Sequence, residues 1–338
     1  MNPLEMRIGL GQFNVLTEEK LSYIKQLGAD DFLMNTPKIP GEKVWELQDL
    51  ADLKRKSDNA ELRLMALENV PISFYDKAML GLPGRNEQIE NMKCTISNIG
   101  KAGIPILGYH WMPSAVWRTP DRAVLRGGAT ATRFNFEFHK DIKNTHERVF
   151  SAEEMWDNYE YYMSRILPVA EESNVKLALH PDDPPIPMLG GVARIFSNFE
   201  GFKAAMEMFD SPYHGLDFCM GCWSEMGGHD YVINAIRYFG SRGKIIYVHF
   251  RDVQGNVPCF NECFINEGNV DPYEVMRTLK ESGFTGFMIT DHVPQFVDDT
   301  DWSHRGRAYA IGYMTAMLEM VNKLSFNPID PIPNGETP

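Results

Sequence analysis

Strand-like and helix-like segments alternate along the whole chain of 338 residues. Short apolar and β-branched runs, which favour strands, lie at residues 6–13, 31–34, 62–68, 104–109, 175–180, 215–219, 244–250 and 286–291. Amphipathic stretches, which favour helices, lie at residues 17–27, 44–56, 85–102, 151–173, 199–209, 230–241, 272–282 and 304–323. Eight strand–helix units predict an α/β fold with a parallel sheet closed into a (β/α)8 TIM barrel. A doubly wound open sheet is the alternative.

Local signals mark several helix ends. Thr17 is an expected N-cap, and Ser151 with Glu154 has the spacing of a capping box. Pro272 occupies a first-turn position where proline is favourable. Because no composition break or linker divides the chain, we expect one barrel domain over residues 1–338, with a C-terminal tail at 325–338.

One connection, after the fourth predicted strand, is much longer than the usual 2–6 residues or so. It covers residues 111–150 and is rich in arginine and tryptophan, with Trp111, Trp117, Arg118, Arg122, Arg126 and Arg133. One interpretation is a surface insertion or oligomer contact. The other is a lid over the barrel mouth whose arginines meet an anion.

Composition narrows the class of partner. An apolar fraction of 43% fits a protein with a sizeable core, and the net charge of −13 opposes nucleic acid and anionic membranes. The chain has no apolar run long enough to span a bilayer and no recognisable secretory signal. Five cysteines without framework spacing indicate a reducing compartment. We therefore expect a cytoplasmic protein whose partner is a small molecule.

Residue types that bind metals stand at the ends of the last four predicted strands: His180, Cys219, His249 and Asp291. Each alone has a structural explanation, as a hydrogen-bonded histidine, a small buried cysteine or a capping aspartate. A barrel, however, brings the carboxyl ends of its strands to one rim. Together, on four adjacent strands, these residues predict a metal site.

The donor set restricts the metal. Two imidazoles, a thiolate and a carboxylate suit a divalent transition ion better than calcium. Four protein ligands could form a closed structural zinc site, but a site at a barrel mouth favours an ion that also accepts substrate oxygens. We expect Mn(II), with Fe(II), Co(II) and Zn as alternatives. Cys222 competes with Cys219 for the thiolate role, and Asp217 supports the site or replaces one ligand.

Several segments in order resemble the mannonate dehydratase family over almost the whole chain. They are IPGEKVWEL (39–47), GLPGRNEQIENMKCTISNIGKAGI (81–104), GYHWMP (108–113), LALHPDDPP (177–185), VHFRDV (248–253) and FNECFINEGNVDPYEVM (260–276). The resemblance implies a xylose-isomerase-like barrel enzyme of hexuronate (glucuronate) catabolism. Such an enzyme dehydrates D-mannonate to 2-keto-3-deoxy-D-gluconate, normally with Mn(II), and forms homo-oligomers. Carried over by motif, the family's ligands fall on His180, Cys219, His249 and Asp291.

The resemblance also implies roles for other residues. His292, directly after the metal aspartate, matches an acid/base residue, with a hydrogen bond to a ligand as its alternative role. Arg251 and Glu262 match family positions, and we expect them to contact substrate, although Arg251 could instead form a structural salt bridge. Asp182 is a candidate for binding a substrate hydroxyl or for shaping its loop. Trp111 is a further substrate-binding candidate.

The chain departs from the family after the metal aspartate. The family reads Asp-His-Gly, followed by a segment with a catalytic tyrosine, whereas Val293 replaces the glycine here and Arg307 occupies the tyrosine position. Tyr309 and Tyr313 lie nearby in a different helical phase, and His110 stands where the family has asparagine. Either Tyr309 or an arginine takes over the catalytic role, or the enzyme uses a different sugar acid.

Three functions fit these observations. The first is dehydration of a sugar acid, with D-mannonate as the leading substrate. The second is a metal-dependent sugar isomerase or epimerase on the same barrel, and the third is a non-catalytic relative that binds metal and sugar acid. The thiolate favours the dehydratase, because isomerase-type sites usually contain carboxylates and histidines.

Overall fold

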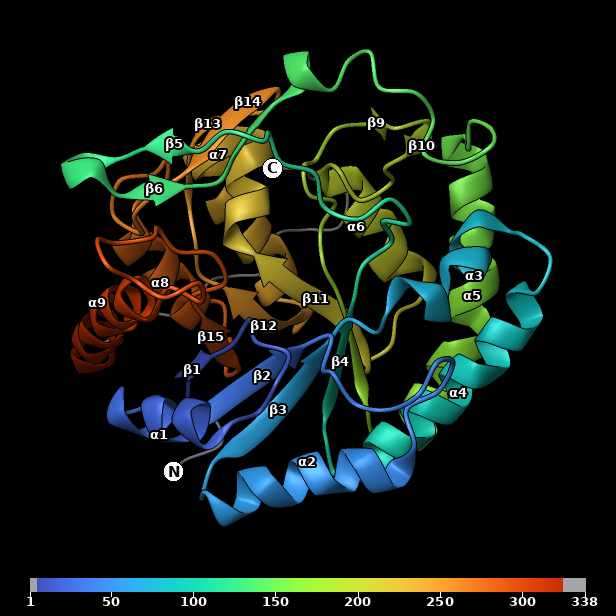
Figure 1. Cartoon of the computed structure of the whole chain (residues 1–338), viewed down its shortest axis with the longest axis horizontal. Coiled ribbons are helices and arrows are strands. Elements are labelled where there is room, and N and C mark those ends of the chain that lie inside the picture. The colour runs from blue at the N-terminus through green and yellow to red at the C-terminus, as the bar shows by residue number, and fades with distance from the viewer. Residues whose placement is uncertain (1–4, 325–338) are drawn as a thin grey trace.

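The computed structural model describes residues 5–324 and contains a closed barrel of eight parallel strands (Figure 1). Around the ring the strands are β1 (Arg7–Leu10), β15 (Phe287–Ile289), β12 (Ile245–His249), β11 (His214–Cys219), β8 (Lys176–Leu179), β4 (Ile106–Tyr109), β3 (Arg63–Glu68) and β2 (Asp31–Asn35). Because β1 pairs in parallel with both β15 and β2, the ring closes. The predicted barrel is confirmed, and the open-sheet alternative is wrong.

Helices surround the barrel and follow its strands in the predicted order (Figure 1). They are α1 (Glu18–Gln26), α2 (Leu47–Asn59), α4 (Arg85–Lys101), α5 (Ala152–Glu172), α6 (Phe199–Met208), α7 (Met220–Ala235), α8 (Pro272–Glu281) and α9 (His304–Lys323). The connection before α4 adds the short η1 (Ile72–Phe74) and α3 (Asp76–Leu80), which the sequence did not reveal.

The predicted helix starts are confirmed by their caps. The Thr17 hydroxyl accepts a hydrogen bond from the Lys20 amide at 3.2 Å. Ser151 and Glu154 form both hydrogen bonds of a capping box at the start of α5. In α8, Asp271 is the N-cap, and Pro272 follows it where its missing N–H costs nothing.

Helix α7 differs from the prediction, which began ten residues later. It starts at Met220, directly after the last residue of β11, bends at Gly228 (φ 72°) and continues into the π-helical η4 (Ile236–Gly240). Its first turns are almost entirely buried and rich in glycine, so no amphipathic period marks them. The early start places Cys222 in the first turn of α7, three residues after Cys219, which is the N-cap.

The barrel strands are buried on both faces, which explains their nearly continuous apolar sequences. A cluster inside the ring joins strands from opposite sides, namely Leu33, Ala66, Ile106, Ala178, Ile246, Tyr247, Phe287 and Ile289. A larger cluster fills the layer between strands and helices. The carboxyl ends of the strands above this packed interior form the mouth of the barrel.

The long connection contributes η2 (Arg126–Gly128), η3 (Phe136–Phe138) and the strands β5 (Ala123–Val124), β6 (Thr130–Ala131) and β7 (Arg133–Asn135). Strand β7 joins the hairpin β13 (Val253–Asn256) and β14 (Cys259–Glu262), which follows β12, in a three-stranded antiparallel sheet. The hairpin β9 (Met188–Leu189) and β10 (Val192–Ala193) follows β8. Segment 111–150 is thus anchored over the mouth, and its role as a lid stays a prediction. The predicted tail at 325–338 lies outside the described residues.

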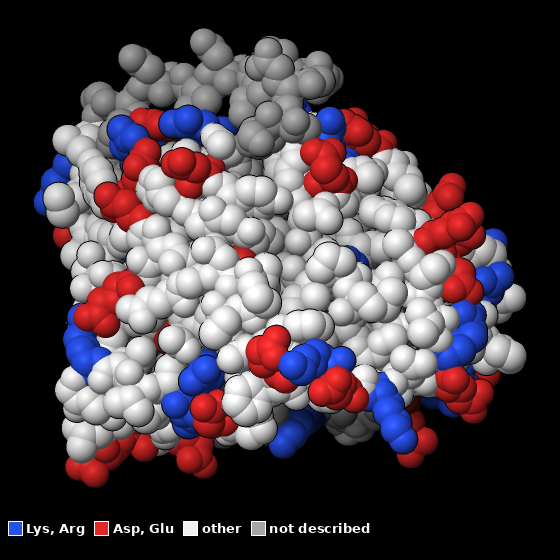
Figure 2. Space-filling view, turned by 90° about the horizontal axis from the view of Figure 1, so that it is seen from above, with Lys and Arg blue, Asp and Glu red and all other residues white. Residues whose placement is uncertain are grey.

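Two surface properties bear on partners. Among residues 5–324, no helix combines the length and apolar character that a membrane crossing requires. On the face shown in Figure 2, acidic and basic side chains are interspersed around an area of uncharged ones. That face therefore carries no continuous basic band of the kind that binds nucleic acid.

Candidate metal centre

The four predicted ligands stand at the carboxyl ends of neighbouring strands. His180 directly follows β8, Cys219 ends β11, His249 ends β12, and Asp291 comes two residues after β15. Asp291 has a φ of 48°, in the left-handed region that non-glycine residues rarely adopt. Such backbone strain clusters at functional sites, where the surrounding structure holds the residue in place.

Three of these residues meet closely. The ligand atoms of Cys219, His249 and Asp291 all lie within 4.8 Å of one another, and all three residues are buried. Cys219 Sγ is 3.9 Å from Asp291 Oδ2, and His249 Nδ1 is 3.6 Å from the same oxygen. A sulfur, a ring nitrogen and a carboxylate oxygen therefore face one small volume.

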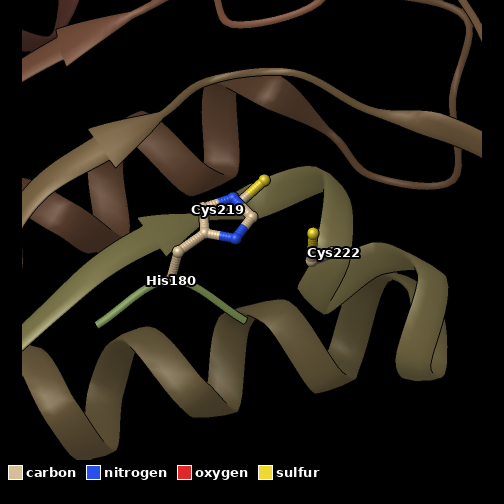
Figure 3. A group of neighbouring side chains, drawn as sticks. All are labelled: His180, Cys219 and Cys222. Atoms are coloured by element: carbon tan, nitrogen blue, oxygen red, sulfur yellow. The ribbon is translucent and has the colours of Figure 1, made fainter. Parts of the chain in front are cut away.

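His180 joins this group from the neighbouring strand. Within the same 4.8 Å limit it groups with Cys219 and Cys222, and separately with Asp217 and His249. Figure 3 shows His180 beside Cys219 at the end of its strand, with Cys222 in the following helix. The structure therefore brings all four predicted ligand residues together, with Cys222 and Asp217 at the edge of the group.

Each of the two histidines has one ring nitrogen whose lone pair is free to bind a cation. His180 Nδ1 lies 2.7 Å from the Pro181 carbonyl and donates to it, which leaves Nε2 as the lone-pair nitrogen. His249 Nε2 lies 2.9 Å from Glu68 Oε2, whereas its Nδ1 is buried and has no hydrogen-bond partner among the described residues. Metal-binding histidines usually donate their other N–H in this way. The residues fit a divalent metal ion.

Two carboxylates, of Glu68 and Asp217, contact the Nε2 atom of His249. Glu68, the last residue of β3, also accepts hydrogen bonds from Gln12 at 3.0 Å and Asn35 at 3.0 Å. Asp217 accepts one from the Tyr247 hydroxyl at 2.8 Å. Sequence reasoning singled out Asp217 but missed Glu68, although a carboxylate at the end of a barrel strand was a visible signal.

The two buried thiols have opposite ionisation tendencies. Burial opposes the charged form of Cys219, but the adjacent Cys222 thiol, the charge of Arg251 and the neighbouring His180 and His249 rings lower its pKa well below the usual value. Burial and the adjacent Cys219 sulfur raise the pKa of Cys222. These directions favour Cys219 over Cys222 as the thiolate.

Arg251 is at the centre of a buried ionic network. Its Nε donates to Asp291 at 2.8 Å, its Nη1 to Glu225 at 2.9 Å, and its Nη2 to Asp183 at 3.2 Å. Nη1 is also 3.2 Å from Glu262. The side chain is only 2% exposed, and each of its nitrogens contacts a carboxylate. Arg251 is therefore placed to orient the predicted ligand Asp291, and its contact with substrate stays a prediction.

The backbone at Gly221 passes close to the guanidinium of Arg251. A Cβ atom at Gly221 would lie 2.2 Å from Nη1 of Arg251, so only glycine fits there. On the other side, Arg118 of the long connection binds both carboxylate oxygens of Asp183 and lies 2.9 Å from Glu262 Oε1. The connection is thus tied by ionic contacts to the loop after β8, a role that its sequence did not specify.

A cavity of about 440 Å³ opens at the barrel mouth, and we call it the mouth cavity. Its lining residues are Gln12, Val116, Arg118, Arg122, Thr132, Glu262, His292, Val293, Asp301, Trp302, Ser303 and Arg307. The His292 side chain is 41% exposed, and its Nδ1 lies 2.9 Å from Glu262 Oε1. Desolvation opposes the charged form of His292, but Asp291 and Glu262 outweigh it and raise the pKa.

The other predicted residues are placed less centrally. Trp111 is 2% exposed and packs against Tyr159 and Tyr162, with both ring centroids at 5.3 Å. Asp182 is also buried, and its Oδ2 accepts a hydrogen bond from the Phe196 amide at 2.7 Å, which shapes its own loop. Neither residue lines the mouth cavity.

Tyr309 likewise lies outside the mouth cavity. Its hydroxyl donates to Asn266 at 3.0 Å and accepts from Arg126 at 3.0 Å. Arg126 belongs to the long connection, so Tyr309 holds that segment against helix α9. Of the two predicted catalytic residues, His292 lines the mouth cavity and Tyr309 does not.

Comparisons with known proteins agree with this architecture. A model of the D-mannonate dehydratase (UxuA) family matches residues 6–147 and 139–328. The mannonate dehydratase of Thermotoga petrophila is 31% identical over 289 residues, which cover 75% of this chain and 79% of the relative. The crystal structure of mannonate dehydratase from Streptococcus suis serotype 2 is 26% identical, with a TM-score of 0.85 and 98% of each chain covered. A D-tagatose 3-epimerase-like protein, at 18% identity and a TM-score of 0.60 over 94% of this chain and 99% of that one, shares the fold alone.

Proposed function

The chain belongs to the mannonate dehydratase family, and on this premise we propose that it dehydrates D-mannonate to 2-keto-3-deoxy-D-gluconate. The reaction makes the protein a lyase of the hydro-lyase class. The observation that carries the proposal is the convergence of imidazole, thiolate and carboxylate donors at the barrel mouth, beside a cavity that His292 lines. A sugar acid in that cavity would contact His292, which directly follows the proposed metal ligand Asp291 in the chain.

The proposed metal ligands are His180 Nε2, Cys219 Sγ, His249 Nδ1 and a carboxylate oxygen of Asp291. The unpartnered Nδ1 of His249 and the lowered pKa of Cys219 support this assignment. A mixed set of nitrogen, sulfur and oxygen donors fits a divalent transition ion, and we propose Mn(II). When bound, the ion supplies Lewis acidity that stabilises the charge developing on the substrate carboxylate as the C2 proton leaves.

Dehydration also needs proton transfers that the chain itself performs. The C2 proton must be removed, and the departing C3 hydroxyl must be protonated. Glu262 Oε1 holds His292 Nδ1 at 2.9 Å, and the nearby carboxylates favour the charged imidazolium. We assign the acid role to His292, because a raised pKa keeps a proton available for the leaving hydroxyl.

A product assay tests the proposed function. Manganese-loaded protein is incubated with a panel of aldonates, D-mannonate first, and 2-keto-3-deoxy acids are measured. We expect product from D-mannonate, and product from another acid alone would change the substrate within the same reaction class. Interconversion of neutral aldoses and ketoses without keto-acid formation would favour a sugar isomerase. Binding of metal and acid without any turnover would indicate a non-catalytic relative.

The cellular setting follows from the same function. We propose that the enzyme acts in hexuronate catabolism in the cytoplasm, as a homo-oligomer whose partner is the sugar acid. The five cysteines are free thiols in the structure, which supports a reducing compartment.

A further inference from the structure

Arg307, in the first turn of α9, is a buried cation whose hydrogen bonds within the described residues all go to neutral groups. Its Nε donates to the Trp302 carbonyl at 2.9 Å. Its Nη1 donates to the Thr290 hydroxyl at 3.0 Å and to the Asp291 carbonyl at 2.8 Å. Within residues 5–324, Nη2 has no hydrogen-bond partner, although the residue is only 6% exposed. The guanidinium therefore has one free edge.

The charge of Arg307 is also unpaired. Among the described residues, no carboxylate forms an ion pair with it. Asp291 contacts Arg307 through its main-chain carbonyl, but its carboxylate oxygen Oδ2 accepts a hydrogen bond from Arg251 Nε at 2.8 Å. Asp299 accepts hydrogen bonds from the backbone amides of Thr300, Arg305 and Gly306. A buried charge without a counter-ion is costly to keep, so pairing it with an anionic ligand is favourable.

The Arg307 side chain lies at the functional site. Arg307 lines the mouth cavity together with His292, and its Nη1 holds the main chain of Asp291, a proposed metal ligand. Its guanidinium lies 4.7 Å from the centre of the Trp302 ring, which fixes its plane. Of the acids on the cavity wall, Glu262 is bound by Arg118 and His292, and Asp301 does not pair with Arg307 in the described chain. The cavity thus offers an oriented, unpaired cation.

We propose that Arg307 is a specificity-determining residue that binds the carboxylate of the substrate through its free Nη2 edge. It would select a sugar acid over a neutral sugar of the same carbon skeleton. An arginine–carboxylate pair is strong and directional when both groups leave water, because the donors are fixed in a planar fork. This inference rests on the proposed function for the identity of the acid, but it concerns binding and not turnover.

Equilibrium binding of two matched compounds tests the assignment. One is a 3-deoxy-D-hexonate, which cannot lose water because it lacks the C3 hydroxyl, and the other is the matching 3-deoxyhexitol, which lacks the charge. Manganese-loaded wild type should bind the acid more tightly than the polyol. Arg307→Met should weaken acid binding about tenfold to a hundredfold, as expected for lost charged hydrogen bonds, and change polyol binding by less than about twofold.

Two further variants make the result specific. Arg307→Lys keeps a positive charge without the fork, so it should retain part of the preference, and it serves as the test if Arg307→Met does not fold. Arg305→Met is the matched control, because Arg305 lies exposed in the same helical turn and does not line the mouth cavity. Manganese content is measured for each protein to show that the site is intact.

The outcomes separate this inference from the proposed function. A preference for the acid that falls in the Arg307 variants supports the inference even if wild type yields no keto acid from any aldonate. An unchanged ratio of acid to polyol affinity in a folded, metal-containing Arg307 variant overturns it, even where D-mannonate is dehydrated. In kinetics, we expect KM for D-mannonate to rise more than kcat falls in Arg307→Lys.

Discussion

His249 Nε2 lies 2.9 Å from Glu68 Oε2, although the two residues come from opposite sides of the barrel. In the ring order, three strands separate β12 from β3 in either direction. The hydrogen bond therefore crosses the top of the barrel interior and turns the free Nδ1 of His249 toward Cys219 and Asp291. A proposed metal ligand is held in place by the far wall of the barrel.

Replacing Glu68 with glutamine should weaken manganese binding about tenfold to a hundredfold, the usual cost of losing an outer partner of a metal-bound histidine. The variant keeps the shape of the side chain but removes its charge and one strong acceptor. Metal affinity is measured by titration of metal-free protein. Glu87→Gln is a suitable control, since Glu87 is a surface residue paired with Lys43. Equal affinities for Glu68→Gln and wild type would count against the proposed role of this pair.

Cys219→Ser should reduce metal content more than any other single cysteine replacement, because the thiolate is a proposed direct ligand. Cys222→Ser should retain most of the metal, since the pKa of Cys222 is raised and its sulfur lies 3.2 Å from Arg251 Nη2. Cys94→Ser, at an exposed position, controls for handling of the protein. Metal per protein is measured by elemental analysis after gel filtration. Greater loss in Cys222→Ser than in Cys219→Ser would exchange the two assignments.

His292→Asn should lower kcat by about 10² to 10⁴ while manganese content stays at the wild-type level, as expected for loss of a general acid. Asparagine retains a donor that Glu262 can hold but transfers no proton at neutral pH. Initial rates of keto-acid formation and metal content are measured together. His229→Asn is the control, because His229 contacts Glu274 on the outer helices. A parallel fall in metal content would instead assign His292 to support of the metal site.

Arg251→Met should destabilise the fold by about 3–5 kcal/mol, because it leaves several buried carboxylates without their counter-ion. Chemical denaturation gives the free energy of unfolding. Arg55→Met is a surface control, with a side chain that is 65% exposed in its pair with Asp52. If Arg251→Met instead raised KM with unchanged stability, Arg251 would be a substrate contact, as the family resemblance implies.

His214 should make the protein less stable as the pH falls from about 6.5 to about 4. Desolvation lowers its pKa from 6.5 to about 4 in the folded state, where Tyr109 and Tyr159 lie 3.0 and 3.2 Å from its Nε2. Between these values the unfolded chain binds the proton and the folded chain does not, so stability is present above pH 6.5 and lost on acidification. Full loss amounts to about 3 kcal/mol.

The free energy of unfolding, measured from pH 7 to pH 4 on wild type and on His214→Gln, checks this linkage. Glutamine cannot ionise, so the variant should lose less stability than wild type over that range. Metal-free protein is used for both, because protonation of the metal ligands would add its own pH dependence. Identical slopes for the two proteins would remove His214 as the source of the effect.

The order of elements was determined by the sequence itself. Strand and helix periodicities are local, and so are the caps at Thr17, Ser151 and Asp271, because each depends on residues a few positions apart. Parallel strands with intervening helices then place every strand end on one rim. For this reason the sequence alone predicts His180, Cys219, His249 and Asp291 as one group. The hidden start of α7 shows the limit, since a segment buried on all sides has no amphipathic period.

Only the tertiary structure decided which side chains meet. Glu68 reaches His249 across the barrel, Arg251 turns inward to four carboxylates, and Arg307 is left with a free edge. Trp111, expected near substrate, is buried in the layer between strands and helices. These contacts join residues far apart in the chain, and they depend on strand register and side-chain direction. Strand register and side-chain direction cannot be predicted from local sequence, because the packing of the closed barrel sets both.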